Sequence, residues 1–145
     1  MAARRPVPPI DRIRRSAIAA AALALLGGHA RASERRWYEA ADAQKRLAES
    51  WGDQPYGAVL VLDDSVVGEG PSRVVKNRDP DAHAEREAIQ DAQRRLGRTS
   101  LAGSVLYSTS RPCPLCEAAA ARAGVSRMVF GAALTDAGPP RAVTQ

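Results

Sequence analysis

We expect the chain to be organised around Asp79-Pro80-Asp81-Ala82-His83-Ala84-Glu85 and, about thirty residues later, Pro112-Cys113-Pro114-Leu115-Cys116. These two stretches contain both cysteines of the 145-residue chain and one of its two histidines. One imidazole, two thiols and a carboxylate form a set that can bind a zinc ion and move a proton of a water molecule. The sequence therefore predicts a metal site built from two distant segments.

Both halves of this set are predicted to lie at the start of a helix. Asp81 is a suitable N-cap for a helix that runs to about Leu96 and ends at Gly97. Pro112 suits the first turn of a second helix, which ends at Gly124. Two helix N-termini that meet at one point favour thiolates through the positive ends of their dipoles.

Three ligands with an open fourth position are typical of a catalytic zinc site rather than a structural one. We expect His83, Cys113 and Cys116 to bind the ion, which lowers the pKa of a bound water to about 7. Glu85, two residues after the histidine, is placed to take that proton and pass it on. A redox pair of thiols at a helix N-terminus is the alternative for the Cys-x-x-Cys spacing.

The flanking segments predict a single α/β domain. Apolar periodicity favours a helix at 34–50, and apolar runs favour strands at 56–62, 65–70, 104–109 and 127–130. Residues 71–77 are expected to be irregular, and the chain from Gly131 onward is expected to be a loose tail. This order indicates a three-layer α/β/α sandwich around a mixed β-sheet.

Residues 1–32 are predicted to be an export signal peptide. The Arg14-Arg15 pair precedes an apolar run, Ala17–Leu26, and Ala30-Arg31-Ala32 follows as a small-x-small cleavage site. The arginine pair partly resembles a twin-arginine signal. Ten apolar residues are too few to cross a bilayer, which takes about 20. An alanine-rich amphipathic helix that stays on the protein is the alternative.

The leader prediction sets the expected location. Residues 33–145 are expected to form the mature domain in the bacterial periplasm, with no stable membrane insertion after cleavage. The protein is expected to be cytoplasmic if the leader is not used.

The basic residues of the chain are concentrated in this leader. Residues 1–32 hold six arginines and one aspartate, a net charge of +5, which equals the net charge of the whole chain. Of the chain's 21 basic and 16 acidic residues, the remainder keeps 15 of each. The overall basicity therefore does not indicate a phosphate-binding surface on the domain.

The paired motif resembles that of the zinc-dependent cytidine/deoxycytidylate deaminase superfamily, His-Ala-Glu followed by Pro-Cys-x-x-Cys. The chain is most similar to the branch that holds tRNA adenosine deaminases and guanine deaminases. Four further stretches carry this likeness: Gly57–Val61, Val67–Gly70, Arg78–Pro80 and, more weakly, Met128–Ala132. The resemblance covers about residues 36–133.

The resemblance implies a cytidine-deaminase-like sandwich, with zinc held by the histidine and the two cysteines and with Glu85 as general acid and base. It also implies that the main chain near Ala84 contacts the base or the attacking water. An asparagine of this branch hydrogen-bonds the base, and Ser72 occupies its place here. Arg111 stands where glutamate is common before Pro-Cys.

The family usually continues past the fourth strand with another strand and a helix, whereas this chain ends at Gln145. We therefore expect a shortened C-terminus whose part of the pocket wall is missing or supplied by a neighbouring subunit, as in a homodimer.

The expected function is hydrolytic removal of an amino group from guanine, adenosine, cytosine or a related base or nucleoside, with release of ammonia. A small-molecule substrate is favoured over tRNA because the predicted mature chain is charge-neutral and leaves the compartment of tRNA processing. Two alternatives stay open. One is a zinc-binding protein of the deaminase fold with weak or no turnover, and the other is an exported thiol oxidoreductase.

Overall fold

The computed structural model describes the backbone of residues 10–142, and the side chains of residue 28 and of residues 30–142. The first nine residues of the predicted leader lie outside the described residues. The chain divides into two compact units between Ser33 and Glu34. The second unit carries all of the predicted site residues.

Helix α1 (Ile10–Ser50) is longer than the sequence predicts. The periodicity predicts a start at Glu34, but the helix runs through the apolar segment and through Ala30-Arg31-Ala32. Alanine has the highest helix propensity, and it dominates this segment, so local preference is sufficient to continue the helix. Within the described part of the chain, no helix combines the length and apolar character needed to cross a membrane.

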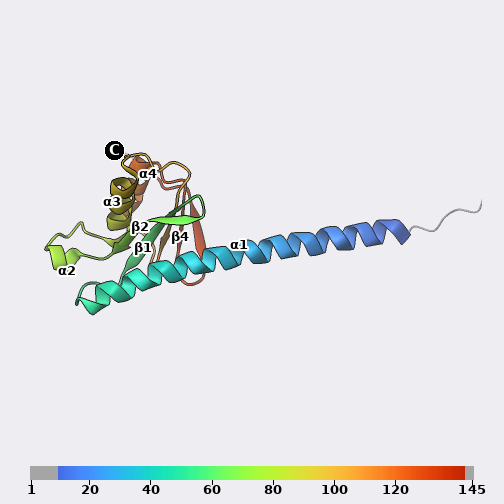
Figure 1. Ribbon diagram of the computed structural model, residues 1–145, viewed down its shortest axis with the longest axis horizontal. Coiled ribbons are helices and arrows are strands. Elements are labelled where there is room, and N and C mark those ends of the chain that lie inside the picture. Colours follow the sequence, from blue (N-terminus) through green and yellow to red (C-terminus); the bar gives the residue numbers. More distant parts are fainter. Residues whose placement is uncertain (1–9, 143–145) are drawn as a thin grey trace, which may run out of the picture. The chain divides into compact units, whose positions relative to one another are not determined.

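A mixed five-stranded sheet forms the centre of the second unit (Figure 1). The strand order is β2-β1-β3-β4-β5, and only β3 and β4 pair in parallel. The strands are β1 (Gly57–Leu62), β2 (Ser65–Pro71), β3 (Val105–Ser108), β4 (Arg127–Phe130) and β5 (Thr135–Gly138). The four strands predicted from apolar runs are therefore present.

Strand β5 corrects the prediction of a loose tail after Gly131. The chain reverses through Gly131 (φ 73°) and Leu134 (φ 55°) and then pairs antiparallel with β4. Leu134 packs against the apolar cluster on one face of the sheet. The exposed residues of β5 carry little hydrophobic pattern, so backbone pairing and this one apolar anchor create a strand that periodicity does not reveal.

Helices cover both faces of the sheet, which confirms the three-layer prediction. Helices α3 (Ala84–Leu96) and α4 (Pro114–Ala123) pack on one face, against a core that includes Leu60, Leu106 and Met128. The part of α1 after Ser33 packs on the other face, where Ala41 contacts the cluster around Val59. Strand β1 is buried on both faces, as its continuous apolar run predicts.

Three glycines allow the helices to lie directly on the strands. A Cβ on Gly57 would lie 2.2 Å from the carbonyl oxygen of Ala41 in α1. A Cβ on Gly68 or Gly70 would lie 2.2 or 2.0 Å from a carbonyl oxygen of α3. No side chain fits these places, so the glycines set how close α1 and α3 approach the sheet.

A one-turn helix, α2 (Val74–Asn77), lies in the segment that the sequence predicts to be irregular throughout. No side chain of α2 is buried, so no apolar stripe marks it in the sequence. Its amides are bound instead by a side chain from a distant loop, Asp53.

Candidate active site

The predicted ligands lie at the starts of α3 and α4, but each helix begins two residues later than predicted. His83 is the N-cap of α3, and Cys113 is the N-cap of α4. Asp81 is not the cap: it lies in a turn in which its N–H donates to the side chain of Asp79 at 2.9 Å, and the helix begins only after His83. The helix starts are therefore corrected to Ala84 and Pro114.

Pro114 explains the second correction. Pro114, not Pro112, occupies the first turn of α4. A residue before proline is restricted to extended backbone, and Cys113 accordingly has ψ 163°. Its Sγ accepts the N–H of Cys116 at 3.4 Å, so the ligand thiol also caps the helix. This cap places both sulfur atoms on one side of the first turn.

The three predicted ligand atoms converge, although the two segments are thirty residues apart. Nδ1 of His83 lies 3.7 Å from Sγ of Cys113 and 3.4 Å from Sγ of Cys116, and the two sulfur atoms are 3.3 Å apart. Tetrahedral zinc with Zn–S bonds of about 2.3 Å needs neighbouring ligand atoms about 3.5–3.8 Å apart. The donor set and its spacing fit zinc.

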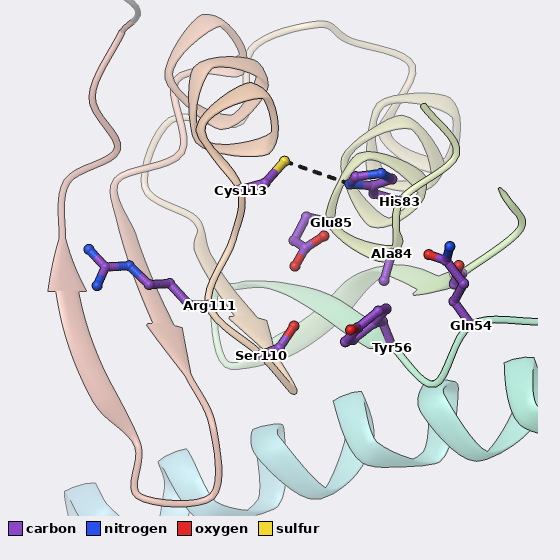
Figure 2. A pocket seen from close by; sticks show the side chains of 9 residues that line it. Gln54, Tyr56, His83, Ala84, Glu85, Ser110, Arg111 and Cys113 are labelled. Atoms are coloured by element: carbon purple, nitrogen blue, oxygen red, sulfur yellow. Dashed lines mark hydrogen bonds between the residues drawn. The ribbon is translucent and has the colours of Figure 1, made fainter. Parts of the chain in front are cut away.

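Glu85 lies in the first turn of α3 with 5% of its surface exposed. Figure 2 shows its carboxylate in the space between Cys113, Ala84 and Ser110. Burial raises the pKa of Glu85 above its ordinary 4.5, while hydrogen bonds and the charge of His83 act in the opposite direction. A carboxyl group with a raised pKa beside a metal site is suited to accept and return a proton.

The buried ligand Cys116 has a raised pKa in the metal-free chain. Burial is the main cause, and the neighbouring carboxylate of Glu85 adds to it. The thiol therefore keeps its proton until a metal replaces it, so zinc binding must release that proton.

A cavity of about 410 Å³ opens beside the ligands. Its lining comes from four parts of the chain: Gln54, Tyr56, Ser72, His83, Ala84, Glu85, Ser110, Arg111 and Cys113. Ala84 and Ser72, the two predicted substrate contacts, are thus next to the predicted metal and proton-transfer residues. Cys116, fully buried in the first turn of α4, is not among the lining residues.

Sequence patterns do not identify Gln54, Tyr56 and Ser110 as site residues. Gln54 and Tyr56 precede β1, and Ser110 follows β3. The pairing of these two strands brings the three residues together, and it continues beyond β3 where Thr109 N–H donates to the carbonyl of Gly57 at 2.9 Å. Tyr56, 43% exposed, offers an aromatic ring to the cavity. A tyrosine directly before a buried strand is the only signal that the sequence holds.

Arg111 lines the edge of the cavity but is directed away from Glu85 and His83 (Figure 2). Its guanidinium carbon lies 5.9 Å from the centre of the Phe130 ring. The arginine therefore packs toward β4 and leaves the space next to the ligands free of its positive charge.

Comparisons with known proteins agree with this geometry. The profile of the cytidine and deoxycytidylate deaminase zinc-binding region matches residues 31–132. A tRNA-specific adenosine deaminase of Buchnera aphidicola subsp. Baizongia pistaciae is 38% identical over 87 residues, which is 60% of this chain and 54% of that protein. The guanine deaminase of Bacillus subtilis is 40% identical over 83 residues, 57% of this chain and 53% of that protein.

A solved structure from a study of A-to-I editing by tRNA:A34 deaminases shares the fold. It superposes with a TM-score of 0.64 at 38% identity and covers 66% of this chain and 70% of that one. The chain spans about half of the length of the two curated relatives above. The match to the family profile covers most of the chain and includes all three ligands and Glu85. The chain therefore belongs to the zinc-binding cytidine and deoxycytidylate deaminase family.

Proposed function

We propose that this chain is a hydrolase that removes an exocyclic amino group from a nucleobase or nucleoside of the guanine, adenosine or cytosine type. The oxygen of a water molecule bonds to the ring carbon, the carbon–nitrogen bond breaks, and ammonia leaves. The observation that carries the proposal is the buried carboxyl of Glu85 in a cavity that two of the predicted zinc ligands, His83 and Cys113, also line.

Each residue has a role in this proposal. His83, Cys113 and Cys116 would hold zinc, which supplies a water of lowered pKa. Glu85 accepts a proton from the attacking water and delivers it to the leaving nitrogen, for which its raised pKa suits it. The main chain at Ala84 borders the same space and is proposed to contact the base.

A free base or nucleoside is the proposed substrate. The cavity volume of about 410 Å³ lies within the range of small-ligand sites. Binding of a folded RNA depends on neutralising several phosphates, whereas the chain after residue 32 has equal numbers of acidic and basic residues. These two properties support the small-molecule substrate.

The test is ammonia release with guanine, adenosine, cytosine and cytidine. Wild type should release ammonia from at least one of them, and Glu85→Ala should lower the rate by about 10²- to 10⁴-fold while zinc content stays unchanged. Glu39→Ala, at an exposed position of α1, is the matched control and should keep full activity.

Two outcomes would support the alternatives. Bound zinc without ammonia from any base would favour a binding protein of this fold. Absence of zinc, together with dithiol activity that depends on Cys113 and Cys116, would make the protein a thiol oxidoreductase.

A tRNA adenosine is the second candidate substrate, because a matching relative is named a tRNA-specific adenosine deaminase. Inosine formation in a tRNA that carries adenosine at the wobble position would identify this activity. A rate that falls by about 10-fold or more as salt rises from roughly 50 to 200 mM would show that phosphate contacts contribute.

We propose in addition that residues 1–32 direct export. The order of basic, apolar and small residues supports this assignment. Periplasmic protein whose N-terminus is Ser33 is the expected result, and exported protein that begins at Met1 would refute cleavage after Ala32. Replacing Arg14 and Arg15 together by lysine should abolish export if the twin-arginine route is used.

A further inference from the structure

Asp53 is a buried carboxylate in the loop between α1 and β1, with 8% of its surface exposed. It accepts four hydrogen bonds. Oδ1 accepts from the Ser72 hydroxyl at 3.0 Å and from the Gln54 N–H at 2.8 Å. Oδ2 accepts from the N–H groups of Val75 and Lys76 at 3.1 and 2.8 Å. One side chain therefore binds both its own loop and the start of α2.

These bonds join two segments that form one wall of the cavity. Gln54 and Ser72 both line the cavity, whereas Asp53 does not. A backbone bond from Ser72 N–H to the Tyr56 carbonyl, 3.0 Å, completes the connection. Asp53 thus fixes the relative positions of Gln54 and Ser72, and through Ser72 that of Tyr56, although Asp53 itself does not line the cavity.

The charge state of Asp53 decides which way the Ser72 hydroxyl points. Burial by itself raises the pKa of Asp53, but hydrogen bonds from Lys76, Gln54, Ser72 and Val75 outweigh burial and lower it. The carboxylate is ionised at neutral pH and can only accept. The single hydroxyl proton of Ser72 is therefore committed to Asp53.

A serine hydroxyl has one proton and two lone pairs. With its proton bound to Asp53, the Ser72 oxygen has only acceptor capacity left. Ser72 is 1% exposed, so bulk water does not compete freely for that capacity. An asparagine in this place would offer both an amide donor and a carbonyl acceptor, and this chain offers an acceptor alone.

We propose that Asp53 is a positioning residue that makes Ser72 a hydrogen-bond acceptor in the wall of the cavity, so that the substrate presents an N–H group to it. The inference rests on the proposed function, because it assumes that the cavity takes a base. An amino group or a protonated ring nitrogen meets this requirement, and a bare ring nitrogen does not.

Two cations of the segment around α2 also contact Trp51 in the loop between α1 and β1. The Lys76 Nζ lies 3.7 Å and the Arg73 guanidinium carbon 4.8 Å from the centre of the Trp51 ring. Arg73 also forms an ion pair with Glu87 of α3 at 3.3 Å. The segment around α2 therefore keeps its contacts with Trp51 and with α3 when Asp53 is changed, and Asp53→Asn is expected to fold.

Asp53→Asn reverses the hydrogen bond to Ser72. Two backbone N–H groups face Oδ2 and only one faces Oδ1, so the amide oxygen replaces Oδ2 and the amide nitrogen faces Ser72. The nitrogen donates to Ser72, whose own proton turns to the cavity. We expect KM for the best base to rise at least about tenfold, with kcat and zinc content within about twofold of wild type.

A double-mutant cycle with Ser72→Ala separates the effect of the Ser72 hydroxyl direction from any movement of the loop that carries Asp53. In the Ser72→Ala background, Asp53→Asn should change KM by less than about twofold. Asp63→Asn, in the exposed turn between β1 and β2, is the control and should leave KM unchanged. An equal rise of KM in both backgrounds, or a parallel loss of kcat and zinc, would overturn the inference.

A measurement without substrate separates this inference from the proposed function. In wild type, NMR should detect a slowly exchanging Ser72 hydroxyl proton and protected amides at Val75 and Lys76. If no base is turned over, the proposed function fails. The NMR measurement still shows whether the Ser72 hydroxyl donates to Asp53. A Ser72 proton that exchanges equally fast in wild type and Asp53→Asn would overturn the inference.

Discussion

Burial of the Glu85 carboxylate costs free energy of folding. A carboxylate that is almost fully buried loses hydration, and the chain compensates only in part through hydrogen bonds and the neighbouring imidazole. Proton-transfer groups are often placed in this way because burial brings their pKa toward neutrality. The motif His-Ala-Glu identifies the residue from sequence alone, but its burial depends on the cavity wall.

Glu85→Gln should stabilise the metal-free protein at pH 7, by about 1 kcal/mol, although it removes the proposed proton carrier. The folded-state pKa is raised, so the unfolded chain ionises first and the native state loses stability as pH rises above 4.5. The stability difference between variant and wild type should therefore vanish below that pH. Urea unfolding of metal-free protein at pH 4 and pH 7 measures it.

The matched control for this variant is Glu39→Gln, an exposed position that should leave stability unchanged at both pH values. A Glu85→Gln protein that is less stable than wild type at pH 7 would show that the carboxylate is satisfied in the native state.

At the scale of elements, close contact between α3 and β2 positions the site. Ala84, Ala88 and Ala92 form a buried stripe on α3, and the stripe lies on Gly68 and Gly70 of β2. Small residues on both surfaces allow backbone to approach backbone. Because His83 and Glu85 flank Ala84, this contact also determines where the ligand and the carboxyl group lie.

Gly70→Ala should therefore affect both stability and the metal. The new Cβ would meet the carbonyl oxygen of Ala84 at 2.0 Å, which is too short, so α3 must move away from β2. We expect the free energy of unfolding to fall by about 3 kcal/mol and zinc affinity to fall about tenfold or more. Denaturant unfolding and competition with a chelating dye measure the two effects.

Glu39→Ala, at an exposed position of α1 within residues 33–145, provides the control and should leave the free energy of unfolding and zinc affinity unchanged. Unchanged zinc affinity in Gly70→Ala would mean that the α3–β2 contact does not hold the ligand histidine in place.

At the scale of the whole molecule, zinc is expected to join α3 and α4. The two helices share one face of the sheet, and their first turns meet at the three ligands. Binding energy available only to the native state adds directly to stability. Removing the metal should therefore weaken the packing of both helices as well as activity.

Chelation by EDTA should lower the free energy of unfolding by about 4 kcal/mol if free zinc exceeds its Kd a thousandfold. For a chain of this size, that corresponds to a fall in Tm of roughly 10 °C. Calorimetry with and without the chelator, at fixed pH, measures the change. The Tm of the double variant Cys113→Ser, Cys116→Ser should not change on addition of EDTA. A wild-type Tm that also stays unchanged with EDTA would contradict a stabilising metal.

Residues 33–145 alone should fold and bind zinc like the full chain, because the boundary of the compact unit lies at Ser33 and Glu34. The ion pair between Glu34 and Arg127 is retained in this fragment. Its Tm should agree with that of the full chain to within about 3 °C. Loss of zinc or a larger fall in Tm would show that the leader segment contributes to the domain.

Short-range patterns allow much of this protein to be predicted from sequence. The spacing of His83, Glu85, Cys113 and Cys116 predicts the site, and continuous apolar runs predict the buried strands, because both patterns depend on residues near each other in the chain. The starts of α3 and α4 lie two residues later than their capping patterns predict. Those patterns do not reveal that Asp79 holds Asp81 and that Pro114 restricts Cys113.

The composition of the cavity wall, and the hydrogen bond that fixes the Ser72 hydroxyl, follow from contacts between distant parts of the chain. Gln54, Tyr56 and Ser110 become neighbours only when β1 pairs with β3, and Ser72 becomes an acceptor only when Asp53 reaches it across 19 residues. Strand β5 likewise exists through pairing rather than pattern. Local spacing in the sequence is enough to predict the three metal ligands and the nearby Glu85, whereas the burial of Glu85 and the residues around it depend on long-range contacts, because local spacing carries no record of which distant backbones pair.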